Sequence, residues 1–412
     1  MTRRLPKPPP RPTTDLPRAL IWSYSLLAAC MAAGYGVLFT VVGDYRERYG
    51  ISEGAIGWII GIGFIAGFAS QILIAPIGDR GRAKAVVLIA VIVNAIGLMM
   101  MGFGDDVTTI MAGRIVAGLA TGAAQPSIRR IVVVGAPDDL GRNLGRLMSA
   151  GVFGFAFGPA ISAVLVGPFG LGAPFLVMAG ASLVAVAIAF SVPIQESTEP
   201  SQRGLLAFDL LRIRPLVGAI VLGAAVYFMI GTFDALWDVV HVDLGTSTWL
   251  ANLGITLFAL PLVILAPIGG KLAQDTGPFR LAAIGLLIAA AFMISYGYLP
   301  SGSWIFAVVM FQAATDGFTL PAAGIGVAMT APAERQAGAQ GLLGAAQALA
   351  AGMAAVAAGT LYEAYGRALT YTMAGLAMVV LVVVGMGLAF SAWRPAATPG
   401  HARGSQADER VQ

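Results

Sequence analysis

Apolar runs long enough to cross a lipid bilayer recur along almost the whole chain. A bilayer core of roughly 30 Å needs about 20 consecutive apolar residues at helical rise. Because 58% of the 412 residues are hydrophobic and 11% are charged, against about 45–50% and about 25% in soluble domains, lipid is the expected solvent. The sequence therefore predicts an all-α polytopic membrane protein with twelve transmembrane helices. These runs cover residues 20–43, 52–78, 85–103, 107–127, 146–167, 171–193, 215–240, 249–269, 280–299, 304–330, 337–361 and 368–392.

The longest hydrophilic insert between runs divides them into two groups of six. The first 18 residues are rich in proline and basic residues and have no apolar core, so we expect a disordered tail rather than a signal peptide. The predicted organisation is a cytoplasmic tail at 1–18, an N-terminal six-helix half at 19–193, a cytoplasmic linker at 194–214, a C-terminal six-helix half at 215–392, and a cytoplasmic tail at 393–412.

A short internal repeat supports two related halves. Residues 74–78 read IAPIG at the end of the second run, and residues 265–269 read LAPIG at the end of the eighth. Both copies come at the same predicted depth before a charged loop. Parallel repeats of this kind are typical of transporters whose substrate site lies between the halves near the bilayer midplane.

The distribution of basic residues predicts the orientation, since Lys and Arg are retained on the cytoplasmic side. With both termini inside, the tails and the even-numbered loops hold 21 of the 25 basic residues. Arg46, Arg48 and Arg367 fall outside, and Arg114 lies within a predicted span. We expect a multi-pass protein of the cell (inner) membrane with both termini cytoplasmic.

Several function classes are excluded by what the sequence lacks. The single cysteine, Cys30, and the two histidines, His241 and His401, cannot assemble a disulfide framework or a Cys/His metal site. No GxxxxGK[ST] phosphate loop occurs. The basic residues are scattered between apolar runs rather than gathered on one surface, which argues against nucleic-acid binding. We therefore expect no metal, no cofactor and no enzymatic activity.

The loop after the second run carries a compact charge cluster. Asp79, Arg80, Gly81 and Arg82 follow the span directly. Asp79 can lie near a helix terminus and pair with a neighbouring basic group, while Gly81 permits a tight turn. Such a cluster could hold one conformation of a transporter closed; the alternative is a basic cytoplasmic loop with no gating role.

One arginine is predicted inside the membrane. Arg114 lies about seven residues past the outer end of the fourth run, or roughly 10 Å deep at 1.5 Å per residue. An arginine at this depth is costly and normally faces a cavity or a partner. The alternatives are a snorkelling side chain and a structural ion pair.

The fifth run contains spaced glycines and a proline, namely Gly145, Gly154, Gly158 and Pro159. Glycines let a neighbouring helix approach closely, and proline removes a backbone donor and bends the helix. Together they could shape one side of a central cavity. Generic helix packing is the alternative, since the chain has 53 glycines.

Two carboxylates are candidates for proton coupling or substrate binding. Asp316 lies about twelve residues from the outer end of the tenth run, roughly 18 Å deep and near the midplane. Asp234 lies in the seventh run, closer to the outer surface. A carboxyl group at such depth suits a cycle in which a proton is gained and lost. A structural pairing of Asp316 with Arg114 is the alternative.

Taken together, these motifs resemble those of the major facilitator superfamily, and in particular its twelve-helix drug:proton antiporters. The resemblance covers nearly the entire chain and implies the two-half fold of that family. It implies a proton-handling role for Arg114, a gating role for the loop at Asp79, and a helix-bend role for the glycines and Pro159. Ala75 and Ser162 stand where that family more often has glycine.

The resemblance predicts a secondary transporter that exports a small lipophilic or amphipathic solute in exchange for protons, working as a monomer in the bilayer. An uptake symporter or facilitator for a metabolite such as a sugar or organic acid is the first alternative. A non-transporting membrane receptor or membrane-embedded enzyme is a more remote one.

Overall fold

The structure is a computed structural model that describes residues 15–49, 53–194 and 206–393. Within these ranges the chain is almost entirely helical, as the apolar runs predict. The N-terminal half consists of α1 (Asp15–Tyr49), α2 (Glu53–Leu73), η1 (Ala75–Arg80), α3 (Ala83–Phe103), α4 (Val107–Gly135), α5 (Leu140–Phe169) and α6 (Ala173–Ser191).

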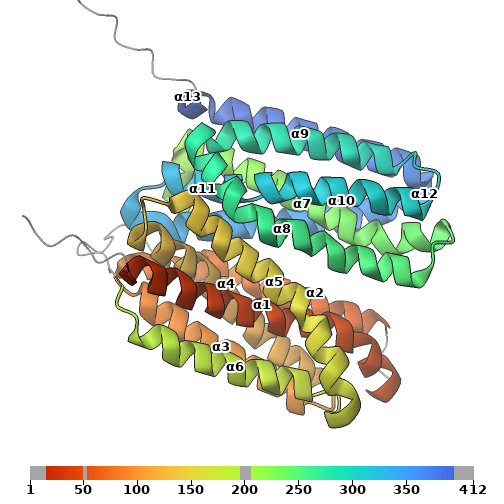
Figure 1. Ribbon diagram of the computed structural model, residues 1–412, viewed down its shortest axis with the longest axis horizontal. Coiled ribbons are helices and arrows are strands. Elements are labelled where there is room, and N and C mark those ends of the chain that lie inside the picture. Colours follow the sequence, from red (N-terminus) through yellow and green to blue (C-terminus); the bar gives the residue numbers. More distant parts are fainter. Residues whose placement is uncertain (1–14, 50–52, 195–205, 394–412) are drawn as a thin grey trace, which may run out of the picture.

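The C-terminal half repeats this plan after the linker (Figure 1). Its elements are η2 (Phe208–Arg212), α7 (Arg214–Asp243), α8 (Thr248–Thr276), α9 (Pro278–Tyr296), α10 (Gly302–Thr319), α11 (Pro321–Thr330), η3 (Ala333–Arg335), α12 (Gln336–Leu388) and the short α13 (Phe390–Trp393).

Two departures from one helix per span have local causes. At 53 residues, α12 would be about 80 Å long, far more than the bilayer needs, but it contains the eleventh and twelfth spans joined at Gly366, whose φ of 75° only glycine adopts readily. The tenth run, predicted as one helix over 304–330, is divided into α10 and α11 before Pro321, which has no N–H to donate. Eleven candidate spans are recognised among the described residues, and the division at Gly366 makes them twelve.

Some helices extend beyond the predicted runs. Asp15 to Arg18 begin α1, although the sequence predicted a disordered tail there; the rest of that tail, most of the linker and nearly all of the C-terminal tail lie outside the described residues. The fourth helix, α4, continues past the predicted end of its run at residue 127 to Gly135, and α5 begins at Leu140, before the predicted start of its run at residue 146. Basic residues assigned from sequence to the loop between these spans therefore lie on helices: Arg129, Arg130, Arg142 and Arg146.

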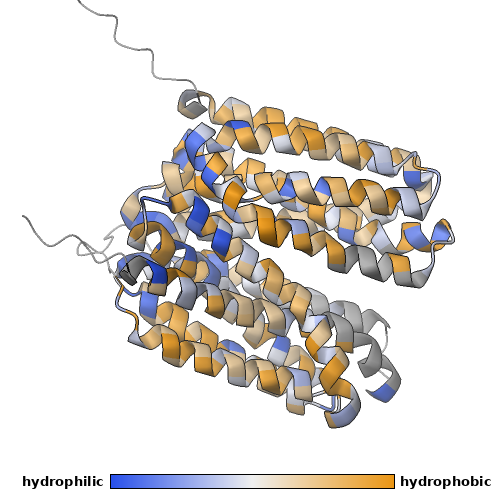
Figure 2. Cartoon of the chain, in the orientation of Figure 1, coloured by the Kyte–Doolittle hydropathy of each residue, from blue (hydrophilic) through white to orange (hydrophobic). Residues whose placement is uncertain are grey.

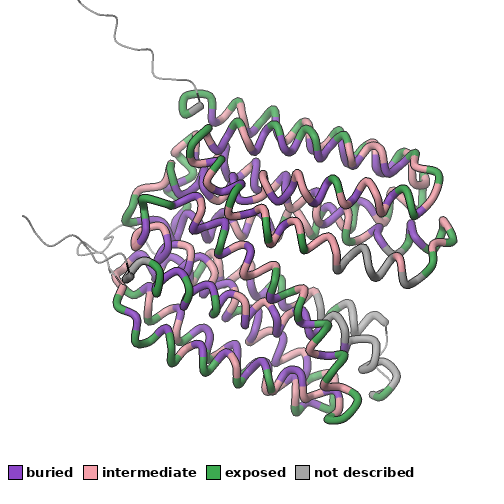
Figure 3. Tube along the Cα trace, in the orientation of Figure 1, coloured by how far each residue is buried: buried purple, intermediate pink, exposed green. Residues whose placement is uncertain are grey.

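The outer surface of the helices is apolar, as a lipid-facing surface requires. Val184, Ile284 and Val383 expose 63%, 58% and 66% of their surface, which a soluble protein would bury. Figure 2 shows hydrophobic residues along the helices, and Figure 3 shows buried positions alternating with exposed ones. The fold is thus that of a multi-pass membrane protein.

The two halves meet at one end of the molecule. In Figure 1, α1–α6 and α7–α12 lie close together near the linker and diverge toward the other end. Contacts between the halves run along two sides, α2 and η1 against α12, and α5 against α8. We call this the closed end, defined by Asp79, Gly141, Gly270 and Ala337; the opposite end carries the turns at Asp106 and Gly366.

Candidate functional site

Asp79 joins the two halves at the closed end. Its carboxylate is 1% exposed and accepts hydrogen bonds from the backbone N–H groups of Ala337 (2.8 Å) and Gly338 (2.7 Å). These residues form the first turn of α12, where N–H groups have no partner within the helix and a negative charge is favoured. Arg130 of α4 completes the arrangement with its Nε 3.2 Å from Asp79 Oδ1. A buried ion pair and a helix N-terminus therefore hold η1 against α12.

The other residues of the charge cluster do not form the buried ion pair with Asp79. Gly81 adopts φ 72° and ends η1, so it makes the tight turn that the sequence predicted. Arg80 is half-buried and Arg82 is exposed. The cation paired with Asp79 is Arg130, 51 residues further along the chain, rather than a basic residue of the same loop. Sequence reasoning missed Arg130 because it placed that residue in a loop.

Glycines of α5 make the second contact at the closed end. A Cβ at Gly145 would lie 2.6 Å from the Cα of Pro267 in α8, and Gly141 packs its backbone directly on the backbone of Gly270. The N–H of Gly141 also donates to Oε1 of Gln274 (2.7 Å). The helices of the two halves thus cross here with almost no side chain between them.

The remaining glycines of this motif pack within the N-terminal half. A Cβ at Gly154 would lie 2.8 Å from the Cα of Ala29, and one at Gly158 would lie 2.6 Å from the N of Val37, both in α1. Pro159 is exposed, and α5 runs through it as one helix. The three glycines therefore divide between two interfaces, and Pro159 belongs to neither.

Arg114 lies in the interior of the N-terminal half. Asp106 caps α4 by accepting hydrogen bonds from the hydroxyl (2.5 Å) and the backbone N–H (3.0 Å) of Thr109, and these two bonds lower the pKa of Asp106, which lies outside the span. Arg114 follows two turns later and is 5% exposed. Its guanidinium carbon is 4.4 Å from the centre of the Tyr35 ring, a cation–π contact. Gly63 leaves room for it, because a Cβ there would lie 2.6 Å from Arg114 Cζ.

Tyr35 is held in place by two further aromatic rings. Its ring centre is 5.6 Å from that of Phe64 in an edge-to-face contact and 5.7 Å from that of Phe155. These residues come from α1, α2 and α5, so three helices position the ring on which Arg114 rests. In the sequence Tyr35 is one aromatic residue among several in the spans, so nothing there could single it out.

Asp234 faces the space between the halves. It is exposed to solvent although it lies within α7, and it interacts electrostatically with Tyr35 of the opposite half. Next to it, the ring centre of Phe233 lies 4.9 Å from that of Trp237 in a tilted contact and 5.7 Å from that of Phe258 in a stacked one. A charged group beside aromatic rings is a setting in which an amphipathic solute could bind.

Asp316 is buried inside the C-terminal half. It is 2% exposed, and its Oδ2 accepts from Nε2 of Gln312 at 3.1 Å. The hydroxyl of Tyr296 donates to Oε1 of the same amide, and the Tyr296 ring meets Tyr371 at 5.7 Å. Gln312 is one helical turn before Asp316, so this partner could have been found from the sequence spacing.

The structure does not bring Arg114 and Asp316 together. Arg114 rests on Tyr35 in one half and Asp316 on Gln312 in the other. Among the described residues, no ion pair is found for either side chain. The structural pairing that the sequence left open is therefore not present in this conformation. The described residues also contain no group of three or more side chains suited to a metal ion.

Twelve spans in two halves, with ionisable side chains buried between lipid-facing helices, describe a multi-pass membrane protein of the transporter class. The sequence matches the model of the Major Facilitator Superfamily over residues 24–253 and 235–411. The chain therefore belongs to the Major Facilitator Superfamily, and transport of a small molecule across a membrane is its general function.

Curated relatives and solved structures agree with this assignment. "Multidrug resistance protein MdtG" of Serratia proteamaculans is 24% identical over 332 residues, covering 74% of this chain and 79% of the relative. The MdtG protein of Salmonella arizonae is 24% identical over 311 residues, covering 70% and 75%.

The fold is shared with two solved transporters. The human organic anion transporter MFSD10 (TETRAN) has a TM-score of 0.77 at 15% identity and covers 90% of this chain and 99% of its own. The proton:xylose symporter XylE has a TM-score of 0.72 at 16% identity and covers 92% and 100%. Since these two differ in substrate, they establish the fold alone.

Proposed function

We propose that this transporter exports a small lipophilic or amphipathic solute in exchange for protons, by alternating access between its two halves. The direction of transport is supported by the similarity to MdtG multidrug resistance proteins along about three quarters of both chains. In this proposal the protein works as a monomer in the cell membrane, with both termini and the closed end in the cytoplasm, and the structure represents the state open to the outside.

The observation that carries the proposal is the separate burial of Arg114 and Asp316. A buried charge normally has a charged partner, because its desolvation is otherwise uncompensated. Here each side chain contacts neutral groups instead: the Tyr35 ring for Arg114, and the Gln312 amide for Asp316. A carboxyl group without a fixed cation can be protonated and deprotonated once per cycle, which is what exchange for protons requires.

The other candidate residues receive distinct roles in this proposal. Asp234, exposed between the halves, contacts the solute or relays its binding to the Tyr35 and Arg114 pair. The Asp79 cluster, with Arg80, Gly81 and Arg82, stabilises the closed end. Gly145 allows α5 to close on α8. The remaining motif positions, Gly154, Gly158 and Pro159, set how α5 packs and bends.

The test uses purified protein in liposomes with an imposed pH gradient. Wild-type protein should move a lipophilic compound against its concentration gradient and dissipate the pH gradient. In Asp316→Asn this coupled transport should be lost, while exchange of labelled for unlabelled solute at equal concentrations should continue, because exchange needs no net proton movement. Arg114→Ala should also lose coupled transport.

Asp105→Asn is the matched control, since Asp105 is an exposed carboxylate at the opposite end of the molecule. It should transport as wild type does. If wild-type protein instead accumulates or equilibrates a metabolite, or if Asp316→Asn still couples transport to the pH gradient, then export by proton exchange at Asp316 is wrong and only the transporter fold stands.

A further inference from the structure

A recess at the closed end lies between the two halves on the membrane-facing side. It has a volume of about 390 Å³ and is formed by one turn of α5 and two turns of α8. The two helices, α5 and α8, lie next to each other in Figure 1. We call it the α5–α8 recess, lined by Arg142, Arg146, Pro267, Ile268, Lys271, Leu272 and Asp275.

The lining carries more positive than negative charge. Lys271 lies 3.5 Å from Asp275, and Arg142 lies 3.8 Å from Asp139, but these pairs are about half-exposed and therefore weak. Arg146 is exposed and donates to the neutral amide oxygen of Asn143 at 3.3 Å. Three basic side chains thus converge on a recess that contains a single carboxylate.

An exposed aliphatic stripe leads away from the recess along α8. Leu260, Ile264 and Ile268 follow at four-residue spacing and expose 55%, 58% and 54% of their surface. Ala266 and Gly270, which meet α5, lie on another side of the same helix. The stripe therefore faces away from the N-terminal half and toward lipid.

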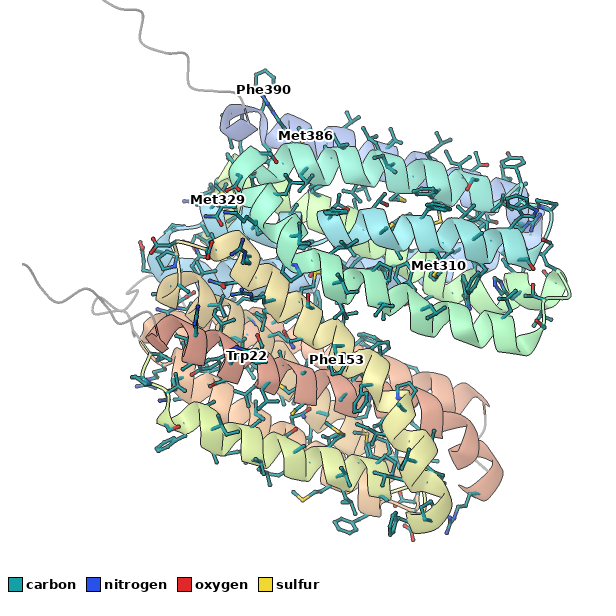
Figure 4. The ribbon with its side chains drawn as sticks, viewed as in Figure 1. Trp22, Phe153, Met310, Met329, Met386 and Phe390 are labelled. Carbon is teal, nitrogen blue, oxygen red and sulfur yellow. The ribbon has the colours of Figure 1, made fainter. Side chains whose placement is uncertain are left out.

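The same arrangement occurs on α5. Two and three turns beyond Arg146, the rings of Phe153 and Phe157 are exposed and stack on each other at 5.5 Å. Figure 4 shows Phe153 on the side of α5 that is turned toward the viewer. Each helix thus presents a basic residue at the closed end, followed by large apolar residues on its membrane face.

We propose that the α5–α8 recess binds one anionic phospholipid. Its phosphate accepts hydrogen bonds from Arg146 and Lys271, with Arg142 adding charge, and its acyl chains lie along the α8 stripe and the two phenylalanine rings. Basic pockets between spans at the cytoplasmic surface have the chemistry for such head groups. A soluble phosphate would match the charges but would leave the apolar faces without a role.

Such a lipid would also shift the equilibrium between the conformations in which the closed end is shut and open. Arg146 belongs to the N-terminal half and Lys271 to the C-terminal half, so both reach the phosphate only while Gly141 lies against Gly270. A ligand that binds one conformation better than another shifts the equilibrium toward it. An anionic lipid in this recess therefore favours the state with the closed end shut.

The test is a lipid titration of delipidated full-length protein, followed by native mass spectrometry. Phosphatidylglycerol should form a one-to-one complex that phosphatidylcholine does not form. Each basic residue near an anionic head group is worth about fivefold in affinity, so Arg146→Gln combined with Lys271→Gln should weaken this complex about 25-fold. Arg212→Gln combined with Arg214→Gln removes the same charge from exposed positions outside the recess and should leave it unchanged.

Three results would overturn the proposal. Equal binding of phosphatidylglycerol and phosphatidylcholine would show that charge does not select the lipid. Equal weakening in both double variants would show that general surface charge is responsible. Displacement of the lipid by millimolar glycerophosphoglycerol or inorganic phosphate would identify a soluble ligand instead. Thermal unfolding in phosphatidylcholine verifies that each variant is folded before its lipid binding is compared.

Discussion

Replacing Asp79 by asparagine should open the closed end. The carboxylate accepts three hydrogen bonds, from Arg130 Nε, Ala337 N and Gly338 N. Asparagine has nearly the same shape, so the packing around position 79 is kept. It carries no charge, however, and one of its two terminal groups is a donor that would face another donor.

The magnitude follows from this count of bonds. Hydrogen bonds to a charged group contribute about 1.5–3 kcal/mol, against about 0.5–1.5 kcal/mol for neutral ones. In Asp79→Asn the bond from Gly338 is lost and the bond from Ala337 becomes a neutral one, while the bond from Arg130 keeps its charged donor; together these changes destabilise the closed end by about 3 kcal/mol. Because the side chain is solvated once the halves separate, the ratio of open to closed molecules should rise roughly 150-fold.

The assay is a distance measurement between spin labels at Asp138→Cys and Glu334→Cys, which are exposed positions of the two halves at this end. The background is Cys30→Ser, because Cys30 is the only cysteine. A longer distance should become dominant in Asp79→Asn but not in Asp105→Asn. An unchanged distance distribution in Asp79→Asn would refute the assignment of Asp79 as the group that holds this end.

Two further predictions concern packing and the linker. Gly158→Ala should lower the free energy of unfolding by about 1–3 kcal/mol, since the new methyl group meets the backbone of α1. Gly151→Ala is the control, because its methyl group meets open space and should have no such effect. Thermal unfolding measures both variants, and equal effects would contradict the packing argument. Asp209→Asn disrupts the bidentate ion pair with Arg335 (2.7 and 3.0 Å) that holds η2 in place. Trypsin should therefore cleave after Arg212 about fivefold faster. An unchanged cleavage rate would mean that this pair does not stabilise the linker.

Hydropathy was sufficient to predict the fold, because each span must satisfy its own backbone hydrogen bonds in lipid and must therefore be a helix. It could not place helix ends that continue past the apolar run. This is why Arg130 was assigned to a loop, although it lies buried in α4 beside Asp79. The division at Pro321 was readable, since proline commonly begins a helix and interrupts one that precedes it.

The candidate residues could be found in the sequence, but only those partners that lie one turn away on the same helix could be found with them. An ionisable residue in an apolar run stands out at once, as Arg114 and Asp316 do. Gln312 could be found from its spacing to Asp316, but the partner of Arg114 could not, since Tyr35 comes from another helix and differs little from other aromatic residues of the spans. The roles of these candidates remain predictions until the transport measurements are made.

The direct contact of Gly141 with Gly270 has a mechanical consequence. On this side of the closed end the halves touch through bare backbone, while on the other side a buried charge binds η1 to α12. Separating the first side breaks few side-chain bonds, whereas separating the second requires solvation of Asp79. We therefore expect the α5–α8 side to separate first and the contact of Asp79 with α12 to break last, rather than both sides separating together.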